Sequence, residues 1–198
     1  IPDLYVICPE FSTTVVDFLY EYQQRTTKGK HYDAVIAHVG VVDFSPRPIS
    51  MLEDMMKVKH HKISLLFGED KVNELKNYHH HAFESLYFGK PVKNFYARSF
   101  LKEHVLPKLQ AIDNLIVIGC SPVLDDWRGN YWRDRPNDMN MILDYCNEYK
   151  AVLAHYVDMS ELTREEIIEY TIDNIHLSQS GFNYVQQLIN AKLTVLLP

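Results

Sequence analysis

The chain has 198 residues, of which 46% are hydrophobic and 23% are charged, and its formal net charge is -6 at pH 7. This composition is typical of a soluble globular protein and excludes disordered and fibrous classes. The acidic balance, without clustered Lys and Arg, argues against a surface that binds nucleic acid. No run approaches the roughly 20 apolar residues that a membrane span requires.

Four apolar runs rich in β-branched residues predict strands, because each shows little polar alternation. They cover residues 4–8, 32–40, 114–121 and 151–159. Strands that helices bury on both faces have this pattern. The runs therefore predict a parallel sheet.

Helical patterns separate these runs. The first helix follows Ser12, Thr13 and Thr14, which favour a helix start, and two others begin near Asn137 and after Gly181. In the first two, apolar residues recur at i, i+3, i+4 and i+7. Alternating strands and helices predict βαβ units with right-handed crossovers, and therefore an α/β fold, a three-layer α/β/α sandwich.

Residues from about 49 to 112 form an insertion between the second and third of these strands. The stretch is too long for a simple crossover and predicts two or three helices, with breaks at "FGED" and "FGKPVKN". Neither an internal repeat nor a low-complexity linker divides the chain. The sequence therefore predicts one domain over residues 1–198.

A long loop at 121–138 follows the end of the third predicted strand. It contains Trp127, Arg128 and Trp132, whose side chains can stack on a sugar or bond an acidic group. Ligands of open α/β sheets bind beyond the carboxyl ends of the strands, so these residues are candidates for the rim of a substrate site. Packing against the insertion, or an oligomer contact, would use the same side chains.

Polar residues follow the other strand ends as well. Gly40 and Asp43 come at the end of the second run, and Asp173 and His176 lie three apart in a polar loop after the fourth. Such a carboxylate can fix the tautomer of a histidine and stabilise the ring when it takes a proton from a serine. The alternatives are an ordinary loop before a helix and, for Gly40 and Asp43, a turn in which the aspartate bonds backbone amides.

The C-terminal stretch "DNIHLSQSGFNYVQQLI" resembles the last block of the SGNH/GDSL hydrolases, in which Asp-x-x-His precedes a polar turn, a glycine and the final helix. The order of other blocks agrees: a strand-end Gly-x-x-Asp from Gly40 to Asp43, then strands that close in "GCSP" and "VDM". This resemblance spans nearly the whole chain. It implies a flavodoxin-like sandwich, no metal or other cofactor, and hydrolysis of an ester by Ser, His and Asp; some members of the family instead transfer acyl groups to or from glycans.

Two departures from the family bear on the reaction. The family's nucleophile lies in a Gly-Asp-Ser motif after the first strand, and that motif does not occur in this chain. Because run 4–8 matches the family's second strand, we expect the first strand and its serine before Ile1, unless the nucleophile was never present. Val42 replaces the asparagine that donates to the oxyanion, a contribution of roughly 3–4 kcal/mol in a comparable enzyme. Arg47 is a candidate donor in its place, and a structural or surface role is the alternative.

Histidine tracts at 59–62 and 78–83 raise the question of a metal site. Consecutive histidines on a helix point in different directions, whereas zinc requires ligands that converge tetrahedrally. A solvated or interface face of the inserted helices is therefore favoured. Cys8, Cys120 and Cys146 lie in apolar stretches without the spacing of a metal or disulfide motif.

Three functions from different classes remain open. The first is an esterase, deacetylase or acyltransferase of SGNH type, with His176 as general base, Asp173 as its orienting partner, and Gly40, Asp43 and Arg47 around the oxyanion. The second is a catalytically inactive relative that binds a ligand or partner, and the third is a metal or redox protein. The expected substrate is a small-molecule or glycan ester, and the composition favours the cytoplasm unless a removed N-terminal segment was an export signal. The sequence indicates no oligomeric state.

Overall fold

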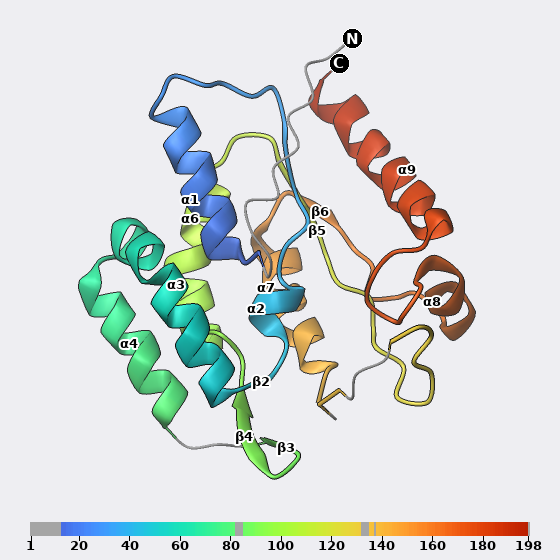
Figure 1. Cartoon of the computed structure of the whole chain (residues 1–198). Helices are drawn as coiled ribbons and strands as arrows, with labels where there is room; N and C mark the ends of the chain where they lie inside the picture. The colour runs from blue at the N-terminus through green and yellow to red at the C-terminus, as the bar shows by residue number, and fades with distance from the viewer. Residues whose placement is uncertain (1–12, 82–84, 132–134, 137, 198) are drawn as a thin grey trace.

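The structure is a computed structural model, drawn in Figure 1, and it describes residues 13–81, 85–131, 135–136 and 138–197. The predicted strand 4–8, Cys8 and Trp132 lie outside these residues. The described part of the chain is a mixed α/β protein with one parallel and one antiparallel sheet. The α/β class and the parallel sheet are therefore confirmed.

Three strands form the parallel sheet, in the order β1, β5, β6. They lie inside three of the predicted runs and are β1 (Val35–Ala37), β5 (Leu115–Ile118) and β6 (His155–Val157). In the register, Ile36 pairs with Ile116, which pairs with His155 on its other side. Because the strands are parallel, their carboxyl ends lie at the same edge of the sheet.

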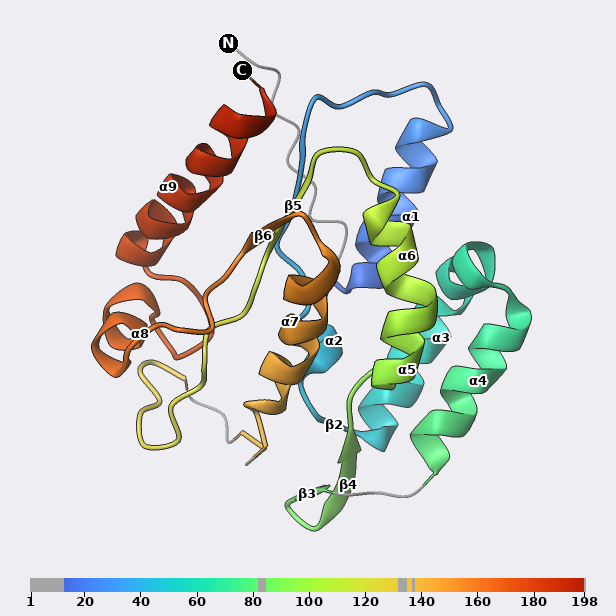
Figure 2. The same ribbon diagram turned by 180° about the vertical axis from the view of Figure 1, so that it is seen from behind.

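Helices cover both faces of this sheet (Figure 2). Along β5, Leu115 and Val117 contribute to one buried cluster, and Ile116 and Ile118 contribute to another, as alternation along a strand requires. The first cluster includes residues of α1 (Val15–Thr26) and α7 (Met141–Val152), and the second includes residues of α8 (Arg164–Tyr170) and α9 (Gln179–Leu196). Burial on two faces explains why these strands are continuously apolar in the sequence.

Short polar side chains set the helix starts. The hydroxyl oxygen of Thr14 accepts from the Asp17 amide, and the Asp17 carboxylate accepts from the Thr14 amide at 2.8 Å, so the two residues cap α1 reciprocally. At α9, Ser178 Oγ accepts from the Gly181 amide at 3.1 Å. Helix α7 begins later than predicted, at Met141, after a turn.

The insertion contains two long helices, α3 (Ile49–Phe67) and α4 (Glu69–His80), which lie side by side as a hairpin (Figures 1 and 2). They turn at Gly68, whose φ of +101° favours glycine. A π-helical turn (Leu101–Val105) lies between two short helices, α5 (Arg98–Phe100) and α6 (Leu106–Gln110). The helices expected between residues 49 and 112 are present.

The insertion also contributes to an antiparallel sheet that the sequence did not predict. Its strands, in the order β2, β4, β3, are β2 (Arg47–Pro48), β4 (Lys90–Lys93) and β3 (Ser85–Tyr87). The predicted break "FGKPVKN" contains the β3–β4 turn at Phe88 and Gly89, both with positive φ, and all of β4. These strands have two to four residues, and Val92 is the β-branched residue among them. Strands this short, two of which contain proline, leave no period-2 pattern in the sequence.

A buried ion cluster joins α1 to α3. Asp17 is fully buried and accepts from Lys59 Nζ at 2.5 Å and from Lys62 Nζ at 2.7 Å. Burial alone would raise the pKa of Asp17, but the hydrogen bonds from the two lysines and from Thr14 hold that pKa below its usual value. The carboxylate is therefore ionised between the two helices.

Candidate functional site

Asp173 and His176 form a hydrogen-bonded pair in the loop between α8 and α9. Asp173 Oδ2 lies 2.7 Å from His176 Nδ1, while Asp173 Oδ1 accepts from the His176 amide at 2.7 Å and from the Ile175 amide at 3.1 Å. The aspartate side chain is 10% exposed and the imidazole is 67% exposed. Because Nδ1 faces the carboxylate, Nε2 is the ring nitrogen that remains available to take a proton.

The environment of Asp173 keeps it ionised. Burial alone would raise the pKa of the carboxyl, but hydrogen bonds from the His176 amide and ring and from the Ile175 amide hold that pKa below its usual value. A negative charge beside Nδ1 stabilises the imidazolium that forms when Nε2 is protonated. Charge and geometry together are those required to support a general base.

The local backbone explains why these two side chains meet. Thr171 pairs with Leu177 in an isolated antiparallel bridge, so the loop closes on itself. Asn174 has a φ of +73° at the tip, a conformation that asparagine tolerates better than most residues. Its amide donates to Thr171 Oγ1 at 3.0 Å. This tight turn brings Asp173 and His176 to the same side of the loop.

The side chain of Asn174 fastens this turn to the loop after β5. Its Nδ2 donates to the carbonyl oxygens of Leu124 and Trp127 at 2.7 and 2.8 Å, and its Oδ1 accepts from the Leu124 amide at 2.9 Å. The Asn130 amide donates to the Ile172 carbonyl at 2.9 Å. The predicted rim loop and the histidine loop therefore form one hydrogen-bonded unit.

The candidate rim residues have different surroundings. Trp127 is half-buried and packs against the apolar cluster under α8 and α9, so much of its ring surface is already covered. Arg128 is exposed. Arg135 donates to the Asp173 carbonyl and lies over the Tyr131 ring, 4.1 Å from its centroid. Arg135 therefore bonds directly to the loop that carries Asp173 and His176.

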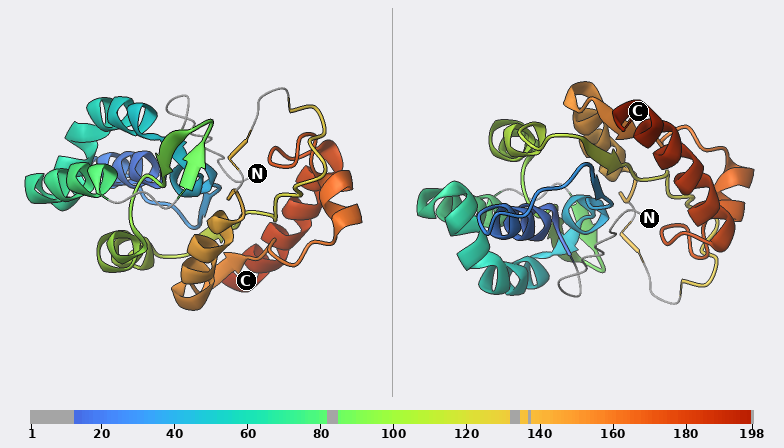
Figure 3. Two further views of the ribbon diagram at one scale, coloured as in Figure 1. Left: turned by 90° about the horizontal axis from the view of Figure 1, so that it is seen from below. Right: turned by 90° about the horizontal axis from the view of Figure 1, so that it is seen from above.

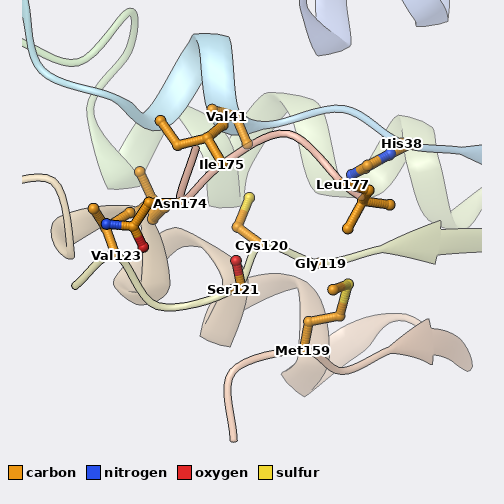
Figure 4. A pocket seen from close by; sticks show the side chains of 11 residues that line it. His38, Val41, Gly119, Cys120, Ser121, Val123, Met159, Asn174, Ile175 and Leu177 are labelled. Carbon is orange, nitrogen blue, oxygen red and sulfur yellow. The ribbon is translucent and has the colours of Figure 1, made fainter. Parts of the chain in front are cut away.

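A pocket lies at the carboxyl ends of the three parallel strands (Figure 4). His38 follows β1, Cys120 and Ser121 follow β5, and Met159 follows β6. The histidine loop borders the same pocket with Asn174, Ile175 and Leu177. The expected convergence of strand ends is therefore present, and the residues on both sides of His176 line the space where the strand ends meet.

Gly40 is the N-cap of α2 (Val41–Phe44), and Asp43 lies within that helix. Helix α2 is the next element after β1. Gly40 has a φ of +127°, and a Cβ there would approach Phe44 Cε2 at 2.7 Å, so both backbone and space require glycine. Asp43 is fully buried and accepts from the Val15 amide at 3.1 and 3.2 Å. Burial raises the pKa of Asp43 to about 7. The carboxyl group therefore contacts the start of α1, whereas Val41 lines the pocket.

Arg47 also makes a backbone contact. Its Nε donates to the Val42 carbonyl at 2.9 Å, and its side chain is half-buried. Burial lowers the pKa of the guanidinium, and the charge of Asp43 opposes that effect. The described residues that line the strand-end pocket do not include Arg47.

Several features of this site were missed by the sequence analysis. The role of Asn174 depends on partners about fifty positions earlier in the chain, although an asparagine between Asp173 and His176 does suggest a tight turn. His38 lies inside the predicted run 32–40, and only the earlier end of β1, at Ala37, places it after the strand and in the pocket. Cys120 lies in the pocket, where the neighbouring Cys146 thiol and burial raise the pKa of its thiol. It is therefore protonated at neutral pH and is a poor nucleophile.

Neither a metal site nor a membrane span emerges from the described residues. They contain no group of three or more His, Cys, Asp and Glu side chains that could hold a metal ion. In the same part of the chain, each helix is too short or too polar to span a lipid bilayer. Comparison of the chain with family models, curated proteins and solved structures finds no match.

Proposed function

We propose that this protein is a serine hydrolase or acyltransferase of SGNH type that acts on an ester, with an O-acyl group on a carbohydrate as its substrate. The observation that carries the proposal is the 2.7 Å contact between Asp173 Oδ2 and His176 Nδ1 beside the strand-end pocket. An ionised aspartate that orients an exposed histidine is the base half of a catalytic triad.

The arrangement of the sheet supports the same proposal. Parallel strands in the order β1, β5, β6, with helices on both faces, are compatible with a flavodoxin-like sandwich. In this proposal β1 corresponds to the strand before the family's Gly-x-Asn-Asp block, and the loop of Asp173 and His176 corresponds to the C-terminal block. Residues that follow β1 and residues of this loop line the pocket at the carboxyl ends of the strands, which is the edge where open α/β sheets bind ligands.

In this proposal the nucleophile is a serine N-terminal to Ile1, as the resemblance to the SGNH/GDSL family implies; within the described residues, His176 bonds to Asp173 and to no serine hydroxyl. His176 Nε2 takes the serine proton as Oγ attacks the ester carbonyl, and a tetrahedral intermediate forms. The alkoxide leaves with that proton, and the acyl-enzyme remains. Water or an acceptor hydroxyl, deprotonated in turn by His176, then releases the acyl group.

A catalytically inactive protein that binds a ligand is the second candidate. The side chain of Val42 cannot donate to an oxyanion, and Nε of Arg47, the residue expected to replace that donor, bonds to the Val42 carbonyl instead. Removal of one such donor costs an enzyme about 10²–10³-fold in kcat. In this case the strand-end pocket binds an ester or glycan without turnover.

Fluorophosphonate labelling of the full encoded protein, followed by peptide mass spectrometry, separates the two candidates. A hydrolase shows one labelled serine, and the label is lost in His176→Ala but retained in His155→Ala, a histidine of β6 outside the pair. Absence of label from every serine, together with retained binding of the ester, contradicts the hydrolase and supports the binding protein.

A further inference from the structure

Two buried cysteines that the proposed function leaves unused meet beside the strand-end pocket. Cys120 follows β5, and Cys146 lies on α7, 26 positions later in the chain. The Cys120 amide donates to Cys146 Sγ at 3.5 Å, and the two thiols are hydrogen-bonded to each other. Both residues are free thiols, 4% and 2% exposed respectively. The fold therefore holds two reduced sulfur atoms in contact.

The contact changes the ionisation of the two thiols in opposite directions. Burial in apolar surroundings raises the pKa of a cysteine and makes it inert. At Cys146, however, the hydrogen bonds from the Cys120 thiol and from the Cys120 amide outweigh burial and lower the pKa to about 7 from 9.0. The same contact raises the pKa of Cys120. Near neutral pH the pair therefore includes one thiolate and one thiol, the combination from which a disulfide forms.

The strand-end pocket gives a small molecule access to this pair. Cys120 lines the pocket, and Figure 4 shows its sulfur among the side chains that surround it. The pocket has a volume of about 10 Å³, which is about the space that one water molecule needs. A molecule close to water in size can therefore approach the two sulfur atoms, whereas a bulky one cannot.

The position of Cys146 in the fold restricts its partner to the same chain. Figure 3 shows α7 (light orange) between the hairpin of α3 and α4 (teal to green) and the pair of α8 and α9 (dark orange to red). Cys146 lies on the buried face of α7 with Ile142 and Tyr149. Because a second protein cannot reach a side chain buried in this way, oxidation of Cys146 leads to an internal bond with Cys120.

We propose that Cys120 and Cys146 form a reversible disulfide when hydrogen peroxide enters the strand-end pocket. The Cys146 thiolate attacks one oxygen of the peroxide, the O–O bond breaks, hydroxide leaves and a sulfenic acid forms. The Cys120 sulfur then displaces the sulfenic oxygen, which leaves as water with the Cys120 proton, and the S–S bond forms. The two sulfur atoms lose two electrons and the peroxide gains them. A small thiol reverses the reaction by exchange.

The disulfide changes the wall of the pocket beside the histidine loop. Its sulfur atoms are ~2.05 Å apart, closer than two hydrogen-bonded thiols, so the end of β5 and α7 must approach each other. The bond also removes the Cys120 thiol from the pocket lining. This oxidation goes beyond the proposed ester chemistry and requires no activity of His176.

Peptide mass spectrometry of the reduced, full encoded protein after treatment with hydrogen peroxide tests the proposal. Because Arg128 lies between the two cysteines, trypsin separates them into different peptides. The expected product is a linked pair of peptides whose mass is two hydrogen atoms below their sum and which dithiothreitol separates. The link is expected to be absent from Cys120→Ser and from Cys146→Ser. Cys8→Ser, which removes the third cysteine of the chain, is the matched control and is expected to retain it.

The same experiment contains the results that would overturn the proposal. They are the absence of a linked pair from the wild type and a link in which Cys8 replaces either partner. tert-Butyl hydroperoxide has the same chemistry but does not fit the pocket, so it is expected to react at least about tenfold more slowly. An equal rate with both peroxides would contradict entry through the pocket. His176→Ala is expected to form the disulfide at the wild-type rate, whether or not the protein is a hydrolase.

Discussion

The side-chain amide of Asn174 donates a hydrogen bond to the main-chain oxygen of Trp127 at 2.8 Å. The same side chain makes two bonds to the backbone of Leu124 and is fully buried. Asn174, one of the two residues between Asp173 and His176, thus holds their loop against the loop that follows β5. Asn174 is a positioning residue, because it acts on the candidate base through the backbone.

Asn174→Gly is expected to lower the free energy of unfolding by several kcal/mol. It keeps the left-handed backbone but removes three hydrogen bonds, and each buried partner left unsatisfied costs about 1–3 kcal/mol. Asn174→Ala loses the same bonds and is expected to be less stable by ~1 kcal/mol more, because alanine disfavours positive φ. Urea unfolding measures both. Wild-type stability in either variant, or an alanine variant more stable than the glycine variant, would contradict this role.

Asp173→Asn is expected to reduce fluorophosphonate labelling and ester cleavage by about 10⁴-fold, if the reaction is that of a Ser-His-Asp triad. The amide no longer stabilises the imidazolium and favours the wrong ring tautomer. The matched control is Asp125→Asn, an exposed aspartate of the rim loop, which is expected to retain full activity. The measurement is the labelling rate of the full encoded protein, and an equal loss in both variants would argue against a specific role for Asp173.

The sequence predicted the features of this protein that depend on local pattern. Strands β1, β5 and β6 are apolar because they are buried on both faces, and Asp173 meets His176 across three positions of one loop. Each signal lies within a few residues of the chain. The parallel sheet and the geometry of the pair therefore follow from short stretches of sequence.

Contacts between distant residues could not be predicted in this way. Asp17 bonds Lys59 across 42 positions, and Asn174 bonds Leu124 across 50. Asp43 follows a strand end, where either a pocket or a core position is possible, and only the packing of α1 against it decides for the Val15 amide. For such residues the tertiary neighbours, and not the local pattern, determine the role.

Asp43 is expected to make stability depend on pH in the neutral range. Burial raises its pKa to about 7 from an ordinary value of 3.8, so the fold favours the protonated form. The resulting stabilisation is fully present below the ordinary pKa and is lost as pH rises to about 7. Asp43→Asn lacks this titration. The melting temperature of the wild type is therefore expected to fall relative to that of Asp43→Asn between about pH 4 and pH 8.

Thermal unfolding of both proteins across that range measures the effect. A constant offset between the two melting curves would mean that Asp43 does not titrate in this range, and it would contradict the raised pKa. Asp33→Asn provides the control, because this aspartate is exposed. Its melting temperature is expected to follow that of the wild type at every pH.

Removal of one partner of the Asp17–Lys59 ion pair is expected to lower the free energy of unfolding strongly, whereas replacement of both partners is expected to lower it much less. Asp17→Asn removes the carboxylate bonded by a lysine that is 2% exposed, and removal of one partner of a buried pair costs about 3–5 kcal/mol. The double variant Asp17→Asn, Lys59→Met is expected to recover much of that loss, since methionine brings no charge into the core. Urea unfolding at neutral pH compares the two, and a double variant less stable than Asp17→Asn would contradict the argument.

Because the pKa of Asp17 is lowered, the contribution of its carboxylate to the free energy of unfolding is present above pH 3.8 and is lost as the pH falls further. The difference in stability between wild type and Asp17→Asn is therefore expected to shrink in acid.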